Sequence, residues 1–259
     1  MTWAFKRQFA YLSILIVFFL GLGFLFAYPY INSKPTCSDA KQNGAETGID
    51  CGGSCARACN FEVDRLSVVW ARSFRVTDGR YNAVAYVENQ NINTAIYRIK
   101  YRFRFADKDN LYIGMREGET FVPPSGKFAI FEPAIGVGNS TPVYTTFEFT
   151  ETPVWVKVPK EEIEKMKVVV SDIRLEDETT TPRMTADMKN GSLYNIPEVN
   201  VVALLYDKEG NAVSVSRTFV DVLRGEQTVP LSFTWPEPFQ TPVVLKEIIP
   251  MYNIFLAKL

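Results

Sequence analysis

The chain has 259 residues, of which 47% are hydrophobic and 14% aromatic, and its formal net charge is −1. A nearly neutral chain has no general attraction to a phosphate backbone, so nucleic acid is not expected as a partner. The sequence contains no histidine. This excludes every Ser–His or Cys–His catalytic arrangement and removes the commonest ligand of transition metals.

A hydrophobic helix is predicted near the N-terminus. Residues 9–28 read FAYLSILIVFFLGLGFLFAY and carry no charge. A helix of about 20 apolar residues crosses the hydrocarbon core of a bilayer, so these residues are predicted to form one transmembrane helix. Pro29 is expected to end it. A cleaved secretory signal is the alternative, although its apolar region is usually only about 7–15 residues long.

The charges beside the helix predict its orientation. Lys6 and Arg7 precede the helix, and the first basic residue after it is Lys34. Positive charge is retained on the cytoplasmic side of a membrane. We therefore expect residues 1–8 in the cytoplasm and a single-pass protein of the plasma membrane, with its C-terminal body outside the cytoplasm.

All the cysteines lie in the segment 35–60, which we call the neck: Cys37, Cys51, Cys55 and Cys59. An even cluster of cysteines in an exported segment predicts disulfides, because a short loop-rich segment lacks a core of its own. The spacing leaves all three pairings open. A zinc site made of four thiolates is the alternative, but such sites favour reducing compartments.

The neck resembles a short module of bacterial secreted and surface proteins, of the form C-x-D-x3-N-x2-E-T-x2-D-C-G-G-x-C-x2-C. It departs from that module at Ala40, where glycine is usual, and at the last step, where Cys55 and Cys59 have the spacing C-x3-C. Four of its side chains offer oxygen ligands that a loop could gather around calcium: Asp39, Asn43, Glu46 and Asp50. The alternative is that they cap turns, with left-handed positions at Asn43-Gly44 and Gly52-Gly53.

From Phe61 onward the sequence is typical of antiparallel strands. Runs of β-branched and aromatic residues alternate with polar ones and are interrupted by Gly, Pro, Asn and Asp. The fold class is therefore predicted as mainly β. One short helical turn is expected at 161–166 after Pro159, and the body is expected to form two antiparallel β-sandwiches, at 61–158 and 165–259.

The second half of the body resembles a divergent copy of the first. Asn89 lies 18 residues before Asp107, and Asn190 lies 17 residues before Asp207. Each aspartate opens a polar turn, and a glycine follows in each half, Gly126 and Gly225. Three landmarks in the same order favour a duplication.

One motif recurs in both halves and carries a family resemblance. Residues 203–207 read ALLYD and residues 103–107 read FRFAD. They resemble the motif of FxLYD and late-embryogenesis-abundant-type domains. The resemblance implies tandem immunoglobulin-like sandwiches of seven strands, found in envelope and surface proteins and generally without enzymatic activity. We expect Phe105 and Leu205 to face a core.

The segment 97–105 predicts a strand with one cationic face. Alternation places Tyr97, Ile99, Tyr101, Phe103 and Phe105 inward. Four cations then point outward: Arg98, Lys100, Arg102 and Arg104. Such a face could bind an anionic polymer. The alternative is a solvated face whose cations pair with Glu88, Glu117 or Glu119 on neighbouring strands.

These features predict a membrane-anchored, extracytoplasmic binding or scaffold protein of the cell envelope that is not an enzyme. We expect no cofactor, and a protein or an envelope polymer as the partner. The alternative is a subunit of an envelope assembly, such as a secretion or pilus-associated complex, that contacts its partners through sheet edges.

Overall fold

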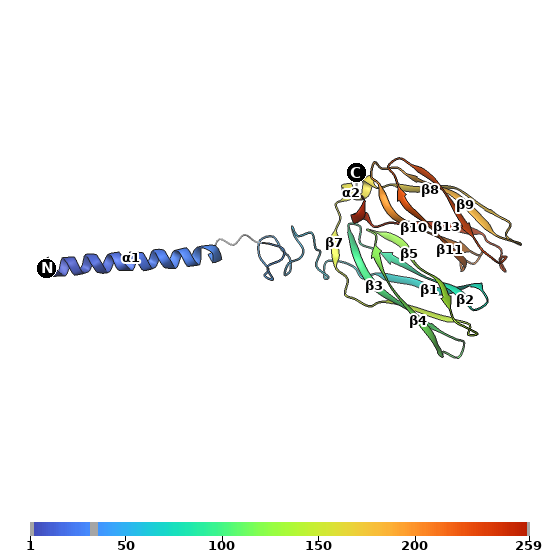
Figure 1. The fold of residues 1–259 in the computed structure, drawn as a ribbon, viewed down its shortest axis with the longest axis horizontal. Coiled ribbons are helices and arrows are strands. Elements are labelled where there is room, and N and C mark those ends of the chain that lie inside the picture. The colour runs from blue at the N-terminus through green and yellow to red at the C-terminus, as the bar shows by residue number, and fades with distance from the viewer. Residues whose placement is uncertain (1–2, 32–35, 258–259) are drawn as a thin grey trace.

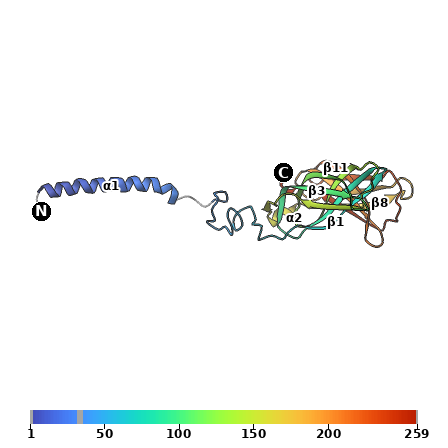
Figure 2. The same ribbon diagram turned by 90° about the horizontal axis from the view of Figure 1, so that it is seen from below.

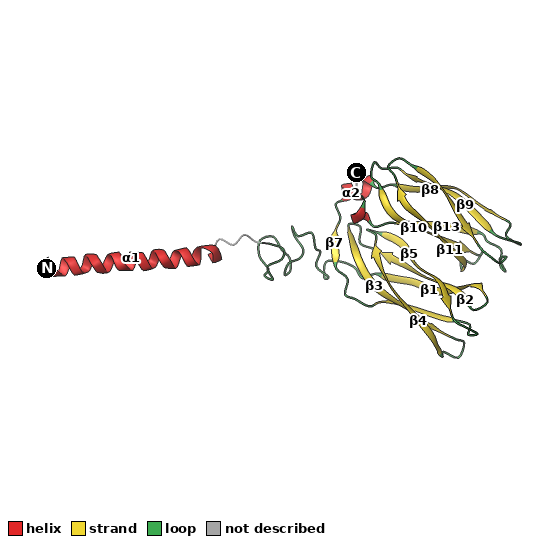
Figure 3. Cartoon of the chain, viewed as in Figure 1, coloured by secondary structure: helices red, strands yellow, loops and turns green. Residues whose placement is uncertain are grey.

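The computed structural model describes residues 3–31 and 36–257. Residues 1–2, 32–35 and 258–259 lie outside the described residues. They include Lys34 and one end of each of three predicted segments: the cytoplasmic segment 1–8, the neck 35–60 and the second sandwich 165–259. The described chain forms an apolar helix, a disulfide-bonded neck and a β-rich body (Figures 1 and 3). The predicted mainly-β fold class is confirmed.

Helix α1 spans Trp3–Ile31 and extends away from the body (Figures 1 and 2). Its apolar stretch Arg7–Tyr28 has 22 residues, none of them buried, and is long and apolar enough to cross a membrane. Pro29 does not end this helix, which continues to Ile31. A proline removes one backbone donor, and so close to the end of a helix little structure remains for it to interrupt.

The body consists of strands and two short helical turns. The turn predicted at 161–166 is helix α2 (Lys160–Lys165), and a 3₁₀ turn, η1 (Ile254–Leu256), lies near the C-terminus. We call β1 to β7 the first unit and β8 to β13 the second. Their bounds are β1 (Ser67–Thr77), β2 (Arg80–Asn89), β3 (Thr94–Ala106), β4 (Tyr112–Val122), β5 (Gly126–Gly136), β6 (Tyr144–Phe149), β7 (Trp155–Lys157), β8 (Val168–Glu176), β9 (Arg183–Asn190), β10 (Ile196–Tyr206), β11 (Ala212–Leu223), β12 (Thr228–Thr234) and β13 (Leu245–Met251).

The two units have the same strand order. The first contains the antiparallel sheets β1-β2-β5 and β4-β3-β6, with β7 added to β3, and the second contains β8-β9-β12 and β11-β10-β13. Asn89 and Asn190 end equivalent strands, β2 and β9. This agreement supports the predicted duplication. The predicted equivalence of Gly126 and Gly225 is wrong. Gly126 lies opposite Asn89, whereas the residue beside Asn190 is Gln227.

The sheets are stacked in four layers (Figure 1), and the inner two, β1-β2-β5 and β11-β10-β13, pack on each other. Leu204 and Ile249 of the second unit belong to the same buried cluster as Val84 and Phe131 of the first. Within the second unit, Ala203 and Leu205 point the other way, into its own core. Strands β2 and β10 are therefore buried on both faces, and the two units share one buried core.

One glutamate ties the two units together. The Glu247 carboxylate of β13 accepts hydrogen bonds from Tyr86 Oη of the first unit, at 2.8 Å, and from Tyr206 Oη of the second, at 2.7 Å. Burial, together with this carboxylate, raises the pKa of both tyrosine hydroxyls above the ordinary value. The interface therefore favours neutral tyrosines.

The tyrosine pair predicts a loss of stability in alkali. A pKa that is raised by folding contributes stability that is complete below the unfolded value, about 10, and is lost as the pH rises through the folded value. Urea unfolding between about pH 8 and pH 11 should show the free energy of unfolding falling above about pH 10. The double variant Tyr86→Phe/Tyr206→Phe should show a shallower fall. An equal slope in the wild-type protein and the double variant would contradict the assignment.

Strand β3 alternates as predicted except at its start. Ile99, Tyr101, Phe103 and Phe105 are all buried, but Tyr97 is 51% exposed. The pairing of β3 with β4 shifts between Ile96 and Ile99, where two residues of β3 face one of β4. This β-bulge turns the preceding side chains out of phase, and Tyr97 packs instead against Phe255.

Candidate functional site

The neck cysteines form two disulfides, Cys37–Cys55 and Cys51–Cys59. The disulfide prediction is confirmed, and the four-thiolate zinc site is wrong because the sulfurs are bonded to one another. The neck is also fixed to the first unit. Ala58 is buried in that unit's core and donates its N–H to Trp155 O of β7, at 3.0 Å. Ala56 O accepts from Lys157 N at 2.7 Å.

The four proposed calcium ligands lie close together in the neck, and most of their oxygens cap the backbone. The Asp50 carboxylate accepts from the N–H groups of Asp39 and Ala40, both at 2.9 Å. Asp39 accepts from Asn43 Nδ2 at 2.8 Å, which lowers the pKa of Asp39. Glu46 accepts from Asn43 N at 3.2 Å, while Asn43 Oδ1 has no partner. This arrangement agrees with turn capping, and calcium binding remains a prediction.

The neck turn contains one unfavourable residue. Ala40 has φ = 59°, a left-handed conformation that favours glycine. Ala40→Gly should therefore stabilise the neck by about 1 kcal/mol. Hydrogen exchange of the neck amides would measure this change. Ala45→Gly, at an exposed position without that conformation, should not stabilise it, and equal effects of the two changes would refute the explanation.

Every cation of the predicted face has a glutamate partner. Lys100 pairs with Glu151 at 2.9 Å, and this hydrogen bond raises the pKa of Lys100. The hydrogen bond to Glu117 likewise raises the pKa of Arg102. Glu117 and Glu119 are partners as predicted, but Glu88 lies on β2 in another sheet. The remaining pairs are Arg98–Glu119 (3.5 Å), Arg102–Glu117 (2.7 Å), Arg102–Glu148 (3.4 Å) and Arg104–Glu148 (3.0 Å). Four cations thus face four glutamates, which favours the solvated face over an anion site.

The repeat explains why this face is charged. Arg102 and Arg104 of β3 correspond to Val202 and Leu204 of β10, because Asp107 corresponds to Asp207. The β10 residues are buried against the first unit, whereas the same face of β3 is the outer surface of the stack. Charge is therefore retained where the face meets solvent and replaced by aliphatic side chains where it meets the other unit.

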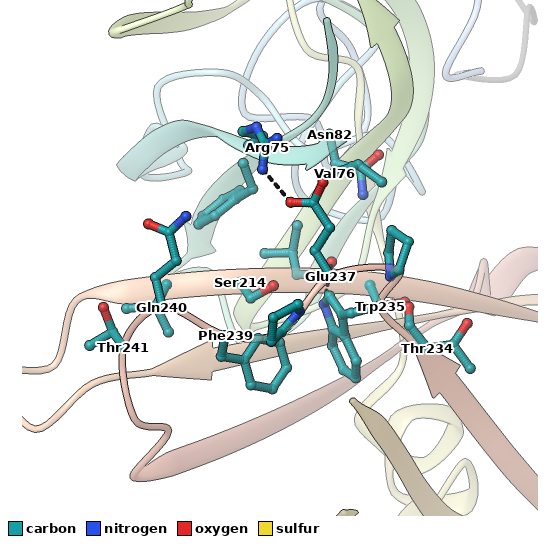
Figure 4. Close-up of a pocket in the computed structure, with 16 residues that line it drawn as sticks. Arg75, Val76, Asn82, Ser214, Thr234, Trp235, Glu237, Phe239, Gln240 and Thr241 are labelled. Atoms are coloured by element: carbon teal, nitrogen blue, oxygen red, sulfur yellow. Dashed lines mark hydrogen bonds and ion pairs between the residues drawn. The ribbon is translucent and has the colours of Figure 1, made fainter. Parts of the chain in front are cut away.

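A cleft opens between the two units at the end of the body away from the neck. Figure 4 shows the residues that line it. Its volume is about 320 Å³. We call it the distal cleft. The first unit contributes residues 74–76 and Asn82, and the second contributes residues 213–216 and 234–241.

An ion pair joins the two sides of the distal cleft. Arg75 of β1 bonds Glu237 of the loop after β12 (Figure 4). Arg75 also bonds Asp78 at 2.7 Å. Hydrogen bonds to Asp78 and Glu237 raise the pKa of the Arg75 guanidinium. Trp235 donates Nε1–H to Val215 O at 3.1 Å and packs edge-on against Phe239, with ring centroids 5.2 Å apart. The cleft thus combines paired charges with a fixed aromatic wall.

The chemistry of the distal cleft suits a polar partner without net charge. Asn82, Gln240 and Thr241 offer hydrogen-bonding groups around the ion pair (Figure 4). Trp235 is only 8% exposed, so most of its ring belongs to the core of the second unit. Sequence reasoning missed the cleft itself, because it is formed by segments of both units.

Comparisons with known proteins give no family. No family model matches the chain, and no curated protein matches it. A transglutaminase from red sea bream matches 74% of this chain and 30% of its own length, at 11% identity and a TM-score of 0.24. The 7S globulin of Momordica charantia matches 70% of this chain and 81% of its own, at 8% identity and a TM-score of 0.13. Likeness at this level carries no argument about fold or function.

Proposed function

We propose that the chain is a membrane-anchored, extracytoplasmic binding or scaffold protein of the cell envelope, without catalytic activity. In this proposal α1 remains in the bilayer and the body presents the distal cleft to a protein or envelope-polymer partner. One observation carries the proposal: the two units share a buried core. Because domains joined by a large apolar interface do not move independently, the cleft keeps a fixed position relative to the neck.

The neck supports the same proposal. Its two disulfides cross-link the neck internally. Its hydrogen bonds to β7 attach it to the first unit. Disulfides persist in oxidising compartments, as expected for a body outside the cytoplasm. The anchor, the neck and the body would then place the distal cleft on the side of the molecule farthest from the membrane.

Labelling with a membrane-impermeant amine reagent on intact cells tests the topology. Lys108 and Lys208 are exposed at equivalent turns of the two units and should react without permeabilisation. Lys6, which precedes the hydrophobic stretch, should react only after permeabilisation. The reverse pattern would reject the proposed orientation. Cross-linking on the same cells would use a photoreactive residue in place of Gln240, in the cleft, or of Asp187, on β9 outside the cleft. A partner should be captured from position 240 only.

A further inference from the structure

Two loops at the neck end of the body expose aliphatic side chains at equivalent positions. Ile92, in the loop between β2 and β3, is 74% exposed, and Leu193, in the loop between β9 and β10, is 70% exposed. Each lies three residues after a fully buried asparagine, Asn89 or Asn190, that ends a strand. The same kind of side chain is thus presented twice, once by each unit, in loops that are otherwise mostly polar.

The buried asparagines hold these loops in place. Asn89 accepts from Asn91 N at 3.1 Å and donates to Thr94 O at 2.9 Å, on either side of Ile92. Asn190 accepts from Ser192 N at 2.9 Å and donates to Tyr194 O at 2.7 Å, on either side of Leu193.

Single exposed apolar residues are common on protein surfaces, and this protein has others, such as Leu111. What distinguishes Ile92 and Leu193 is that both units present the same kind of side chain at the equivalent loop tip, at one end of the body.

The position of the two loops decides what that contact is. Val158 N donates to Asn93 O at 2.8 Å, and Gly191 N donates to Lys167 O at 2.6 Å, so both loops lie beside the β7–α2 segment. The neck is bonded to the same segment, and in Figure 1 this end of the body faces α1. The chain from Ile31 to Cys37 covers at most about 20 Å when fully extended. A bilayer that holds α1 therefore lies within that reach of Cys37, on the side of the body that carries the neck and these loops.

We propose that Ile92 and Leu193 insert into the surface of the lipid bilayer in which the chain is anchored, and so dock the body on it. The inference rests on the membrane anchor of the proposed function. Aliphatic side chains suit the boundary between headgroups and acyl chains. Because the anchor keeps the body beside the bilayer, its high effective concentration lets two side chains suffice. Docking would orient the body and turn the distal cleft away from the lipid.

A fluorescent probe at each loop tests this docking in the full chain. All four native cysteines are in disulfides, so a cysteine introduced by Ile92→Cys or Leu193→Cys is labelled selectively with an environment-sensitive dye. The control is Leu111→Cys, at a loop tip on the opposite end, where the native side chain is 64% exposed. Each protein is reconstituted in phosphatidylcholine vesicles, with and without lipids that carry a nitroxide quencher near the headgroup.

The expected result is quenching of the probes at positions 92 and 193 and no quenching at 111. In the chain labelled at position 92, a second change, Leu193→Ser, should lower the ratio of docked to undocked molecules, read from the quenching of that dye, about tenfold. Leu111→Ser in the same labelled chain should not change this ratio. Three equally unquenched probes on a chain that resists carbonate extraction would overturn docking and leave the anchor intact. A chain that carbonate extracts would overturn the anchor as well.

Discussion

Leu204→Asp should unfold both units together, at a cost of about 4 kcal/mol or more in the free energy of unfolding. Leu204 is fully buried in the core that the two units share. A carboxylate there would lose its hydration without gaining a partner, and the inner sheets could not remain packed on each other. Urea unfolding followed by tryptophan fluorescence and by circular dichroism would measure the loss.

The repeat supplies a matched control for this change. Arg104 occupies the position equivalent to Leu204 but lies on the outer face of the stack, where it pairs with Glu148. Arg104→Asp should cost less than about 1 kcal/mol, because exposed ion pairs contribute little. Leu204→Met should cost less than about 1.5 kcal/mol, because it conserves apolar volume. If Leu204→Asp behaved like Arg104→Asp, the shared core would be wrong.

Asn190→Ala should lower the free energy of unfolding by about 3 kcal/mol or more. The Asn190 side chain is fully buried and donates to the carbonyls of Tyr194, Leu223 and Arg224, at 2.7, 3.2 and 3.0 Å. It also accepts from Ser192. Alanine would leave these buried groups without partners. Thermal and urea unfolding would both report the change.

Asn89→Ala should have a similar effect, because Asn89 plays the same part in the first unit and donates to Thr94 O and Pro123 O. Asn139→Ala is the control, since Asn139 is exposed in a loop, and it should change stability by less than about 0.5 kcal/mol. Equal losses from Asn190→Ala and Asn139→Ala would show that the buried asparagine is not a structural element of the repeat.

Local patterns predicted much of the fold. Alternation in β3, the spacing of Asn89 and Asp107, and the clustering of four cysteines led to a strand, a repeat and two disulfides that the structure contains. The pairing of the cysteines could not be predicted, because several pairings are compatible with one spacing. The outward turn of Tyr97 was missed because a β-bulge breaks the period of two without a signal such as glycine.

The arrangement of the two units could not be read from alternation alone. Residues 82–87 read NAVAYV and residues 201–206 read VVALLY, with little of the alternation that a half-exposed strand requires. A continuous apolar run indicates a strand buried on both faces, and this was the available signal for the inner sheets. Such a run does not say which sheets meet. The distal cleft, where Arg75 of one unit bonds Glu237 of the other, therefore could not be predicted.

The central claim is that the two units are one cooperative body, and hydrogen exchange tests it directly. Exchange of the full chain would be followed by mass spectrometry at increasing urea, with β2 and β9 compared because they lie at the centres of sheets in different units. The account predicts that their slowest amides open with the same free energy and the same dependence on urea. Opening of one strand at lower urea, while the other stays protected, would contradict it.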